Sequence, residues 1–135
     1  MEYRCSIIFF SVYHQLAHDG MLKKEYGYYD IYNYRNSKYF IETVKEARRY
    51  EKDTNSDLVI FAGACQSYFE ALMQAGANFA SSPARILIDI LDPLIVAKDV
   101  AITDDFKYIR MEDIENELRD GRRGVGGIGA RRKEN

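Results

Sequence analysis

A chain of 135 residues has room for one domain around a single core, and its hydrophobic fraction of 47% is ordinary for a globular protein. The formal net charge of -2, and the lack of any apolar stretch near the roughly 20 residues of a membrane span, give no reason to expect nucleic acid or a membrane as partner. Only two cysteines are present, Cys5 and Cys65, which excludes the disulfide framework of small secreted proteins and favours free thiols in a reducing compartment.

The first third of the chain predicts a strand, a loop and a helix. Residues 5–13 are apolar almost without interruption and rich in β-branched and aromatic side chains, which is typical of a strand buried on both faces of a parallel sheet. Residues 19–36 hold glycines and many tyrosines without helical or strand periodicity, so they predict a long loop. Apolar residues at helical spacing then predict a helix that Asn36 or Ser37 caps and that continues to about Lys52.

The middle of the chain predicts three strands. Residues 58–62 form a second buried strand, and residues 63–67 form the bend into a helix that ends at Gly76. A short strand is expected at residues 78–80, and a third long strand at residues 85–88, because both segments are apolar and bounded by turn residues. Strands and helices therefore alternate along this part of the chain.

The last part of the chain predicts two further helices. Asp92 has the position of an N-cap with Pro93 in the first helical position, which predicts a helix to Val100. Residues 108–110 are typical of an edge strand, and residues 111–120 of an amphipathic helix. The alternation of strands and helices predicts an α/β fold, a three-layer sandwich with a mostly parallel sheet.

The domain organisation that follows is simple. We expect a single α/β domain over residues 1–120, of which residues 1–17 are an atypical start. Residues 121–135 are rich in glycine and arginine and contain few core-forming residues, so we expect a mobile tail.

Two residues with catalytic chemistry follow predicted strands. His18 lies beyond the first strand, and Cys65 lies at the junction between the second strand and its helix. Ligand sites in parallel sheets lie at the carboxyl ends of the strands, so both residues are expected at one edge. The pKa of a thiol falls at a helix N-terminus or beside an imidazole. We therefore predict that His18 accepts the proton of Cys65 and that the thiolate attacks a substrate carbonyl.

The same two segments supply candidate oxyanion donors. The backbone N–H groups of Cys65 and Gly20 are predicted to hold the oxyanion, since Gly20 lets the backbone approach a substrate closely. This chemistry requires no cofactor. Two histidines and two cysteines without close pairing do not give the spacing of a zinc site, so no metal is expected.

The arrangement of histidine and cysteine resembles the caspase-like clan of peptidases. His18 precedes Cys65 by 47 positions, and the caspase signature likewise places an Ala-Cys pair about 50 residues after its histidine. The resemblance is one of spacing and architecture, because the residues that flank the caspase pair are absent here. It implies a partial caspase-like fold.

Longer motifs resemble one family more closely. Residues 18–20, 34–40, 58–66 and 75–83 look like the YabG family, the sporulation-specific cysteine proteases of spore-forming bacteria. The likeness runs from His18 to Thr103 and again over residues 124–128, which covers most of the chain. His18 and Cys65 match the catalytic pair of that family.

The resemblance implies a cysteine endopeptidase that processes spore coat and cortex-associated proteins late in sporulation, near arginine. Protein substrates are then the expected partners, and the cytoplasm of the mother cell or the spore coat is the expected location. Family members are longer, so this sequence is expected to lack their N-terminal region. Residues 1–17 depart from the family strand that leads to the His-Asp-Gly motif, and the family pattern also changes after Ile128.

An arginine side chain in the substrate would require a carboxylate in its pocket. Asp89 and Asp92 follow the third predicted strand, where such a pocket is expected. Asp89 is the preferred candidate, because N-capping already accounts for Asp92.

Several alternatives remain open. A cysteine in an apolar strand is by default a small core residue, and His14 competes with His18 although no glycine follows it closely. A non-peptidase thiol hydrolase favours glycine at the position of Ser67, and a truncated inactive remnant would act only as a protein-binding module. The tyrosine-rich loop and basic tail also suggest base stacking, but the tyrosines lack interleaved basic residues and the net charge is negative, so no nucleic acid is expected.

Overall fold

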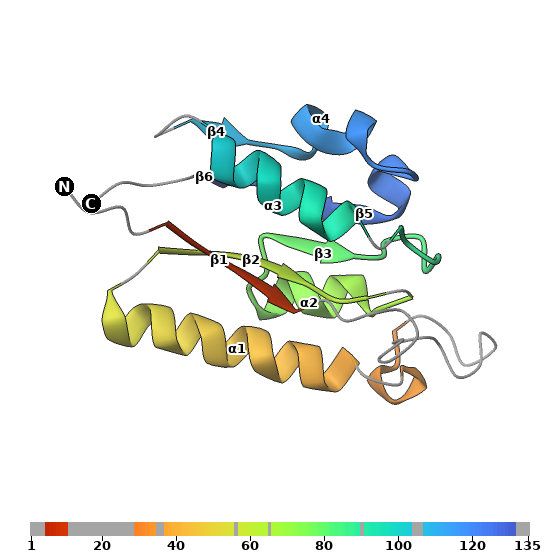
Figure 1. Cartoon of the computed structure of the whole chain (residues 1–135). Helices are drawn as coiled ribbons and strands as arrows, with labels where there is room; N and C mark the ends of the chain where they lie inside the picture. The colour runs from red at the N-terminus through yellow and green to blue at the C-terminus, as the bar shows by residue number, and fades with distance from the viewer. Residues whose placement is uncertain are drawn as a thin grey trace.

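The computed structural model describes residues 5–10, 29–34, 37–55, 57–64, 66–89, 91–103 and 107–131. They form a mixed α/β fold around a small mixed sheet (Figure 1). The sheet has the strand order β1 (Cys5–Phe10), β2 (Asp57–Ala62), β3 (Phe79–Ser81) and β5 (Val125–Gly127). The first three strands are parallel, and β5 runs antiparallel to β3. A separate antiparallel pair consists of β4 (Tyr108–Ile109) and β6 (Ala130–Arg131).

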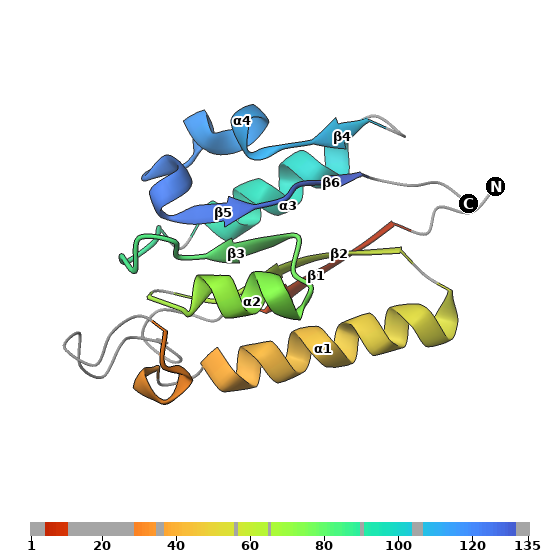
Figure 2. The same cartoon turned by 180° about the vertical axis from the view of Figure 1, so that it is seen from behind.

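Helices cover both faces of the sheet (Figures 1 and 2). α1 (Ser37–Thr54) and α2 (Phe69–Ala75) lie on one face, whereas α3 (Asp92–Ile102) and α4 (Met111–Ile114) lie on the other. Three short 3-10 helices complete the described elements: η2 (Ile31–Asn33), η3 (Glu115–Glu117) and η4 (Gly121–Arg123). None of the described helices combines the length and the apolar character of a membrane span.

The side chains of β2 enter two hydrophobic cores. Leu58, Ile60 and Ala62 pack in the core that α1 and α2 cover. Val59 and Phe61 point to the opposite face, into the core that α3 and α4 cover. Successive side chains of a strand alternate between faces, so burial on both faces requires the continuous apolar run that the sequence shows. β2 is therefore the second buried strand that the sequence predicts.

The elements predicted up to β3 are confirmed. β1, α1, β2, α2 and β3 all occur where the apolar patterns indicate, and Gly76 ends α2 with φ 122. Most of the loop expected over residues 19–36 lies outside the described residues, and the described part contains η2.

The strand predicted at residues 85–88 is wrong. Arg85 has a left-handed backbone, with φ 55, which interrupts the extended conformation of a strand. The Ser82 hydroxyl also takes the place of a neighbouring strand, because its Oγ accepts from the N–H of Ile86 and donates to the carbonyl of Ile86 (2.9 and 3.0 Å). The segment is therefore an irregular connection between β3 and α3.

Two predictions on helices also need correction. Leu91, not Asp92, occupies the N-cap of α3, and Asp92 lies in its first turn. The helix expected over residues 111–120 is the short α4 followed by η3. Leu118 is extended and buried in the α3-side core, and the Arg119 N–H donates to Asp92 Oδ1 (3.5 Å), so tertiary contacts end the helix early.

Residues 121–131, expected to begin a mobile tail, instead contain η4, β5 and β6. Their glycines fit close packing. A Cβ on Gly126 would lie 2.8 Å from Phe69 Cζ, and a Cβ on Gly127 would lie 2.2 Å from the carbonyl oxygen of Asn78. The composition that resembles a flexible tail is therefore what allows β5 to pack against the sheet.

Candidate functional site

The strands that lead toward His18 and Cys65 are neighbours. β1 and β2 pair in parallel, and Phe10 at the end of β1 lies opposite Ala62 at the end of β2. His18, Gly20 and Cys65 themselves lie outside the described residues. The structure thus places the ends of the two preceding strands at one edge of the sheet, which is the juxtaposition that the catalytic prediction requires.

Residues 63–68, which we call the elbow, connect β2 to α2 around position 65. Gly63 has φ 106, and a Cβ there would lie 2.9 Å from Leu72 Cδ1. Within the elbow, the Ala64 N–H donates to Ser67 Oγ (2.8 Å), and Gln66 has a left-handed backbone with φ 58. The backbone on each side of position 65 is therefore tightly constrained.

Two neighbouring segments anchor the elbow. The Tyr68 N–H donates to Ser37 Oγ at the start of α1 (2.9 Å), and the Gln66 N–H donates to the carbonyl of Ile86 (3.2 Å). α2 begins at Phe69, with Tyr68 as its N-cap, so the described residues of the elbow lead directly into this helix.

A buried arginine lies beside the elbow. Arg85 is 3% exposed, and its Nη2 donates to both carboxylate oxygens of Glu70 (2.9 and 2.8 Å). Its Nε donates to the Tyr34 hydroxyl (2.6 Å). The rings of Tyr34 and Tyr68 stack with centroids 5.0 Å apart, and the guanidinium lies 5.7 Å from each centroid. These residues join the segment before α1, the elbow, α2 and the connection after β3.

Burial and hydrogen bonding act on the ionisation of this cluster. Desolvation lowers the pKa of Arg85, but the hydrogen bonds to Glu70 and Tyr34 outweigh it, so the pKa lies above its ordinary value. Burial raises the pKa of Tyr34 despite the nearby guanidinium. Arg85 is therefore a permanent cation, and Tyr34 accepts its hydrogen bond as a neutral phenol.

The structure brings Asp89 and Asp92 together at the start of α3. Asp89 Oδ1 accepts from the Leu91 N–H (2.8 Å), and the carbonyl of Asp89 accepts from the Asp92 N–H (3.0 Å). Asp92 is 2% exposed, and its Oδ2 has no hydrogen-bond partner. Burial raises the pKa of Asp92, although the hydrogen bond from the Arg119 N–H opposes this. Both carboxylates follow β3, whose carboxyl end lies at the same edge as the elbow.

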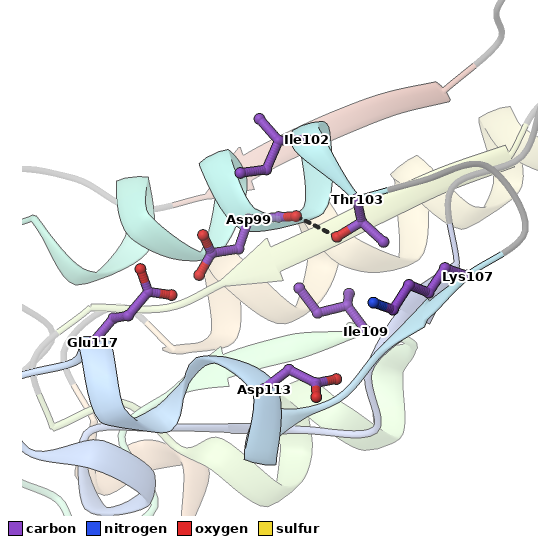
Figure 3. A pocket seen from close by; sticks show the side chains of 7 residues that line it. All are labelled: Asp99, Ile102, Thr103, Lys107, Ile109, Asp113 and Glu117. Carbon is purple, nitrogen blue, oxygen red and sulfur yellow. Dashed lines mark hydrogen bonds between the residues drawn. The ribbon is translucent and has the colours of Figure 1, made fainter.

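A cavity of about 250 Å³ lies at the other end of α3 (Figure 3). Its lining combines apolar, carboxylate and lysine side chains: Asp99, Ile102, Thr103, Lys107, Ile109, Asp113 and Glu117. Burial, and then hydrogen bonding and repulsion from Glu117, raise the pKa of Asp99 to about 6. Among the described residues, no group of three or more metal-ligating side chains is arranged to hold a metal ion. None of the residues that line the cavity belongs to the elbow, and the end of α3 near β4 lies away from the carboxyl ends of β1 and β2 (Figure 1).

Comparison with known proteins assigns the family. A family model described as YabG peptidase U57 matches residues 15–134. This chain belongs to the YabG peptidase family. The sporulation-specific protease YabG of Bacillus subtilis (strain 168) is 44% identical over 116 residues, which cover 85% of this chain and 39% of that protein. The chain thus spans about two fifths of the length of this curated relative, and no solved structure matches it.

The region that matches the YabG family model includes most of the described structure. It contains the elbow, Arg85 and β5, together with the positions of His18 and Cys65. The sequence alone did not indicate the cluster around Arg85, because Arg85 and Glu70 are 15 positions apart and share no motif. The available signal was the family-like block at residues 34–40, which supplies Tyr34 and Ser37 to the elbow.

Proposed function

We propose that this chain carries the catalytic pair of a cysteine endopeptidase of the YabG type. The observation that supports this most is the parallel pairing of β1 with β2, with Phe10 opposite Ala62 at their carboxyl ends. The segments that continue from these ends contain His18 and Cys65. A thiol and an imidazole on adjacent strand ends are the components of a Cys/His dyad. The proposed fold is a partial caspase-like three-layer sandwich.

The proposed reaction proceeds in two steps. His18 removes the proton of Cys65, and the thiolate attacks the carbonyl carbon of the scissile bond. The N–H groups of Cys65 and Gly20 stabilise the tetrahedral oxyanion. His18 then protonates the departing amine and leaves a thioester. Water, deprotonated by His18, attacks the thioester and releases the acid product and the free thiol.

The elbow supports this chemistry in two ways. Its left-handed Gln66 is the kind of backbone conformation that persists where surrounding contacts impose it, as in many active sites. Ser67 occupies the position where non-peptidase thiol hydrolases favour glycine, and its hydroxyl closes the elbow by accepting from Ala64. The elbow is thus built differently from the turn of those hydrolases, which favours the peptidase.

The proposed substrates are spore coat and cortex-associated proteins, cleaved near arginine. Asp89 and Asp92 are the carboxylates proposed to receive the arginine side chain. Asp89 is the preferred member of this pair, because Asp92 is 2% exposed and its carboxylate is buried. The mother cell cytoplasm, or the spore coat, is the proposed location, since the curated relative is named a sporulation-specific protease.

The test compares the purified chain with two variants, Cys65→Ala and the matched control Cys5→Ala, on an arginine-containing coat protein. We expect cleavage by the wild type and the control and none by Cys65→Ala, with product ends located by mass spectrometry. Cleavage that persists in Cys65→Ala contradicts the assignment of the nucleophile. A folded, soluble wild type that does not cleave favours the alternative, a truncated remnant that only binds protein.

A further inference from the structure

We propose that Arg85 is a positioning residue for Cys65, acting through Tyr34, Glu70 and the elbow. This inference rests on the proposed function, because it assigns a role relative to the catalytic thiol. Arg85 itself is not proposed to touch the substrate. Its role is to hold the described residues on either side of Cys65, Ala64 and Gln66, in the backbone conformation that they have in the elbow.

Burying the charged guanidinium of Arg85 costs free energy. A guanidinium that is 3% exposed has lost nearly all of its hydration, and replacing a whole buried ion pair by apolar side chains often gives equal or greater stability. Every nitrogen of Arg85 nevertheless has a partner. Besides Tyr34 and Glu70, its Nη1 donates to the carbonyls of Ser82 (3.5 Å) and Pro83 (3.2 Å). This complete set of partners fixes the relative positions of the segments that supply them.

Arg85 lies where several segments of the chain meet. Tyr34 precedes α1, Tyr68 ends the elbow, and Glu70 lies in the first turn of α2. Arg85 holds Glu70 with two hydrogen bonds and faces the stacked rings of Tyr34 and Tyr68. The next residue, Ile86, accepts the hydrogen bond of the Gln66 N–H. The cluster therefore holds the elbow directly at Tyr68, and at Gln66 only through the backbone of Ile86.

Gln66, the residue that follows Cys65, has an unusual backbone conformation. Gln66 has φ 58 although it is not glycine, and a left-handed non-glycine residue costs about 1–3 kcal/mol and persists only where its surroundings impose it. Its N–H bond to Ile86 and the Ser67 hydroxyl on Ala64 are the contacts that impose this conformation. A displacement of about 1 Å in a catalytic group can reduce the rate about 100-fold. A side chain that fixes these contacts therefore acts on the reaction as well as on the fold.

The experiment uses three variants of the full chain. Arg85→Lys keeps the charge but loses the separate nitrogens with which the guanidinium reaches Glu70, Tyr34 and Pro83 at once. Tyr34→Phe removes only the hydroxyl and keeps the ring stack, so it serves where Arg85→Lys folds poorly. Arg48→Lys is the matched control, because Arg48 donates to the carbonyls of Gly76 (2.8 Å) and Leu58 (2.9 Å) and to Asn78 (2.7 Å), away from the elbow.

The readouts are the unfolding free energy, kcat and KM, and the alkylation rate of each cysteine against pH. Iodoacetamide labels are assigned to Cys5 and Cys65 by peptide mass spectrometry, so that Cys5 is an internal reference. We expect Arg85→Lys and Tyr34→Phe to reduce kcat by about 10- to 100-fold, with KM nearly unchanged, and to alter the pH profile of Cys65. Arg48→Lys should reduce stability and leave kcat and the pH profile of Cys65 unchanged.

The outcomes separate the two proposals. If Arg85→Lys and Tyr34→Phe lose stability like Arg48→Lys but keep the kcat and the Cys65 profile of the wild type, Arg85 is purely structural and the inference is overturned. If Cys65 of the wild type reacts no faster than it does in the unfolded chain, and no peptide bond is cleaved, the proposed function fails first. A Cys65-specific change in the two elbow variants alone supports the positioning role.

Discussion

Arg85 beside the elbow and Asp99 beside the cavity are both buried charged groups, but their partners differ. Arg85 is 3% exposed, and acceptors surround all of its nitrogens. Asp99 is 8% exposed, and its Oδ2 has no hydrogen-bond partner. The first stays ionised at any pH at which the protein folds, whereas the second has a pKa raised to about 6. For Arg85 the hydrogen bonds outweigh the effect of burial on the pKa, whereas for Asp99 burial is the largest cause of the raised pKa.

The largest expected effect comes from removing the fixed charge. Arg85→Met keeps much of the side-chain volume but leaves Glu70 and the Tyr34 hydroxyl without their donor, so we expect a loss of about 3 kcal/mol in unfolding free energy. Denaturant titration followed by circular dichroism measures this. Glu70→Gln is the control, since it keeps a hydrogen-bond acceptor and should cost less. A loss for Arg85→Met within experimental error of zero would show that the cluster adds nothing to stability.

A smaller loss is expected from the elbow backbone. Gly63→Ala places a Cβ 2.9 Å from Leu72 Cδ1 at a residue with φ 106, so we expect a loss of about 2 kcal/mol. Gly121→Ala is a useful control, because φ there is 55 but the nearest atom to a new Cβ is 3.7 Å away. Equal losses in the two variants would mean that conformation, rather than contact with Leu72, is what requires glycine at Gly63.

Much of the region around the elbow follows from local sequence patterns. The apolar run of β2, the periodicity of α1 and the stop at Gly76 each depend on residues close in the chain, so the sequence predicts them. The strand expected at residues 85–88 fails because the Ser82 hydroxyl and the left-handed Arg85 redirect an apolar run. No local pattern reports such a contact.

The glycines of β5 are a second case in which local sequence patterns do not predict the structure. Gly126 and Gly127 belong to a composition that usually indicates a mobile tail. In the fold, they are the residues whose missing side chains let β5 lie against Phe69 and Asn78. Likewise, the sequence predicts that His18 and Cys65 follow strands, but the pairing of Arg85 with Glu70 depends on how those strands and helices assemble. The pairing of Arg85 with Glu70 is therefore visible only in the three-dimensional arrangement of the chain, and not in the types of its residues.

The raised pKa of Asp99 predicts that Asp99→Asn is more stable than the wild type, by an amount that depends on pH. Below the ordinary pKa of Asp99, 3.8, the group is neutral in both the folded and unfolded chain, and its contribution to stability is fully present. That contribution is lost as the pH rises through about 6, because the buried carboxyl must then ionise. We expect Asp99→Asn to be more stable than the wild type by about 1–2 kcal/mol at neutral pH, and by less as the pH falls toward 4. Urea unfolding of both proteins across this range measures the difference.

A gain for Asp99→Asn that stays constant with pH would contradict a raised pKa and indicate better packing by the amide. Comparing the variant with the wild type at each pH removes the contribution of the carboxyl groups that do not contact Asp99, whereas Glu117 loses its contact with that carboxyl group. Lys98, whose Nζ lies 3.7 Å from Asp99 Oδ1 and 3.5 Å from Glu117 Oε1, is present in both proteins.

The smallest effect tests how the raised pKa arises. Burial is the largest cause for Asp99, and the carboxylate of Glu117 adds to it by hydrogen bonding and repulsion, while the same contact lowers the pKa of Glu117. Glu117→Gln removes the second cause and keeps the first. In that background, the pH at which the gain of Asp99→Asn reaches half its full size should shift to a lower value without returning to the ordinary pKa. An unchanged midpoint would assign the whole effect to burial, and Asp99 would then titrate as an isolated buried acid rather than as one member of a carboxyl pair.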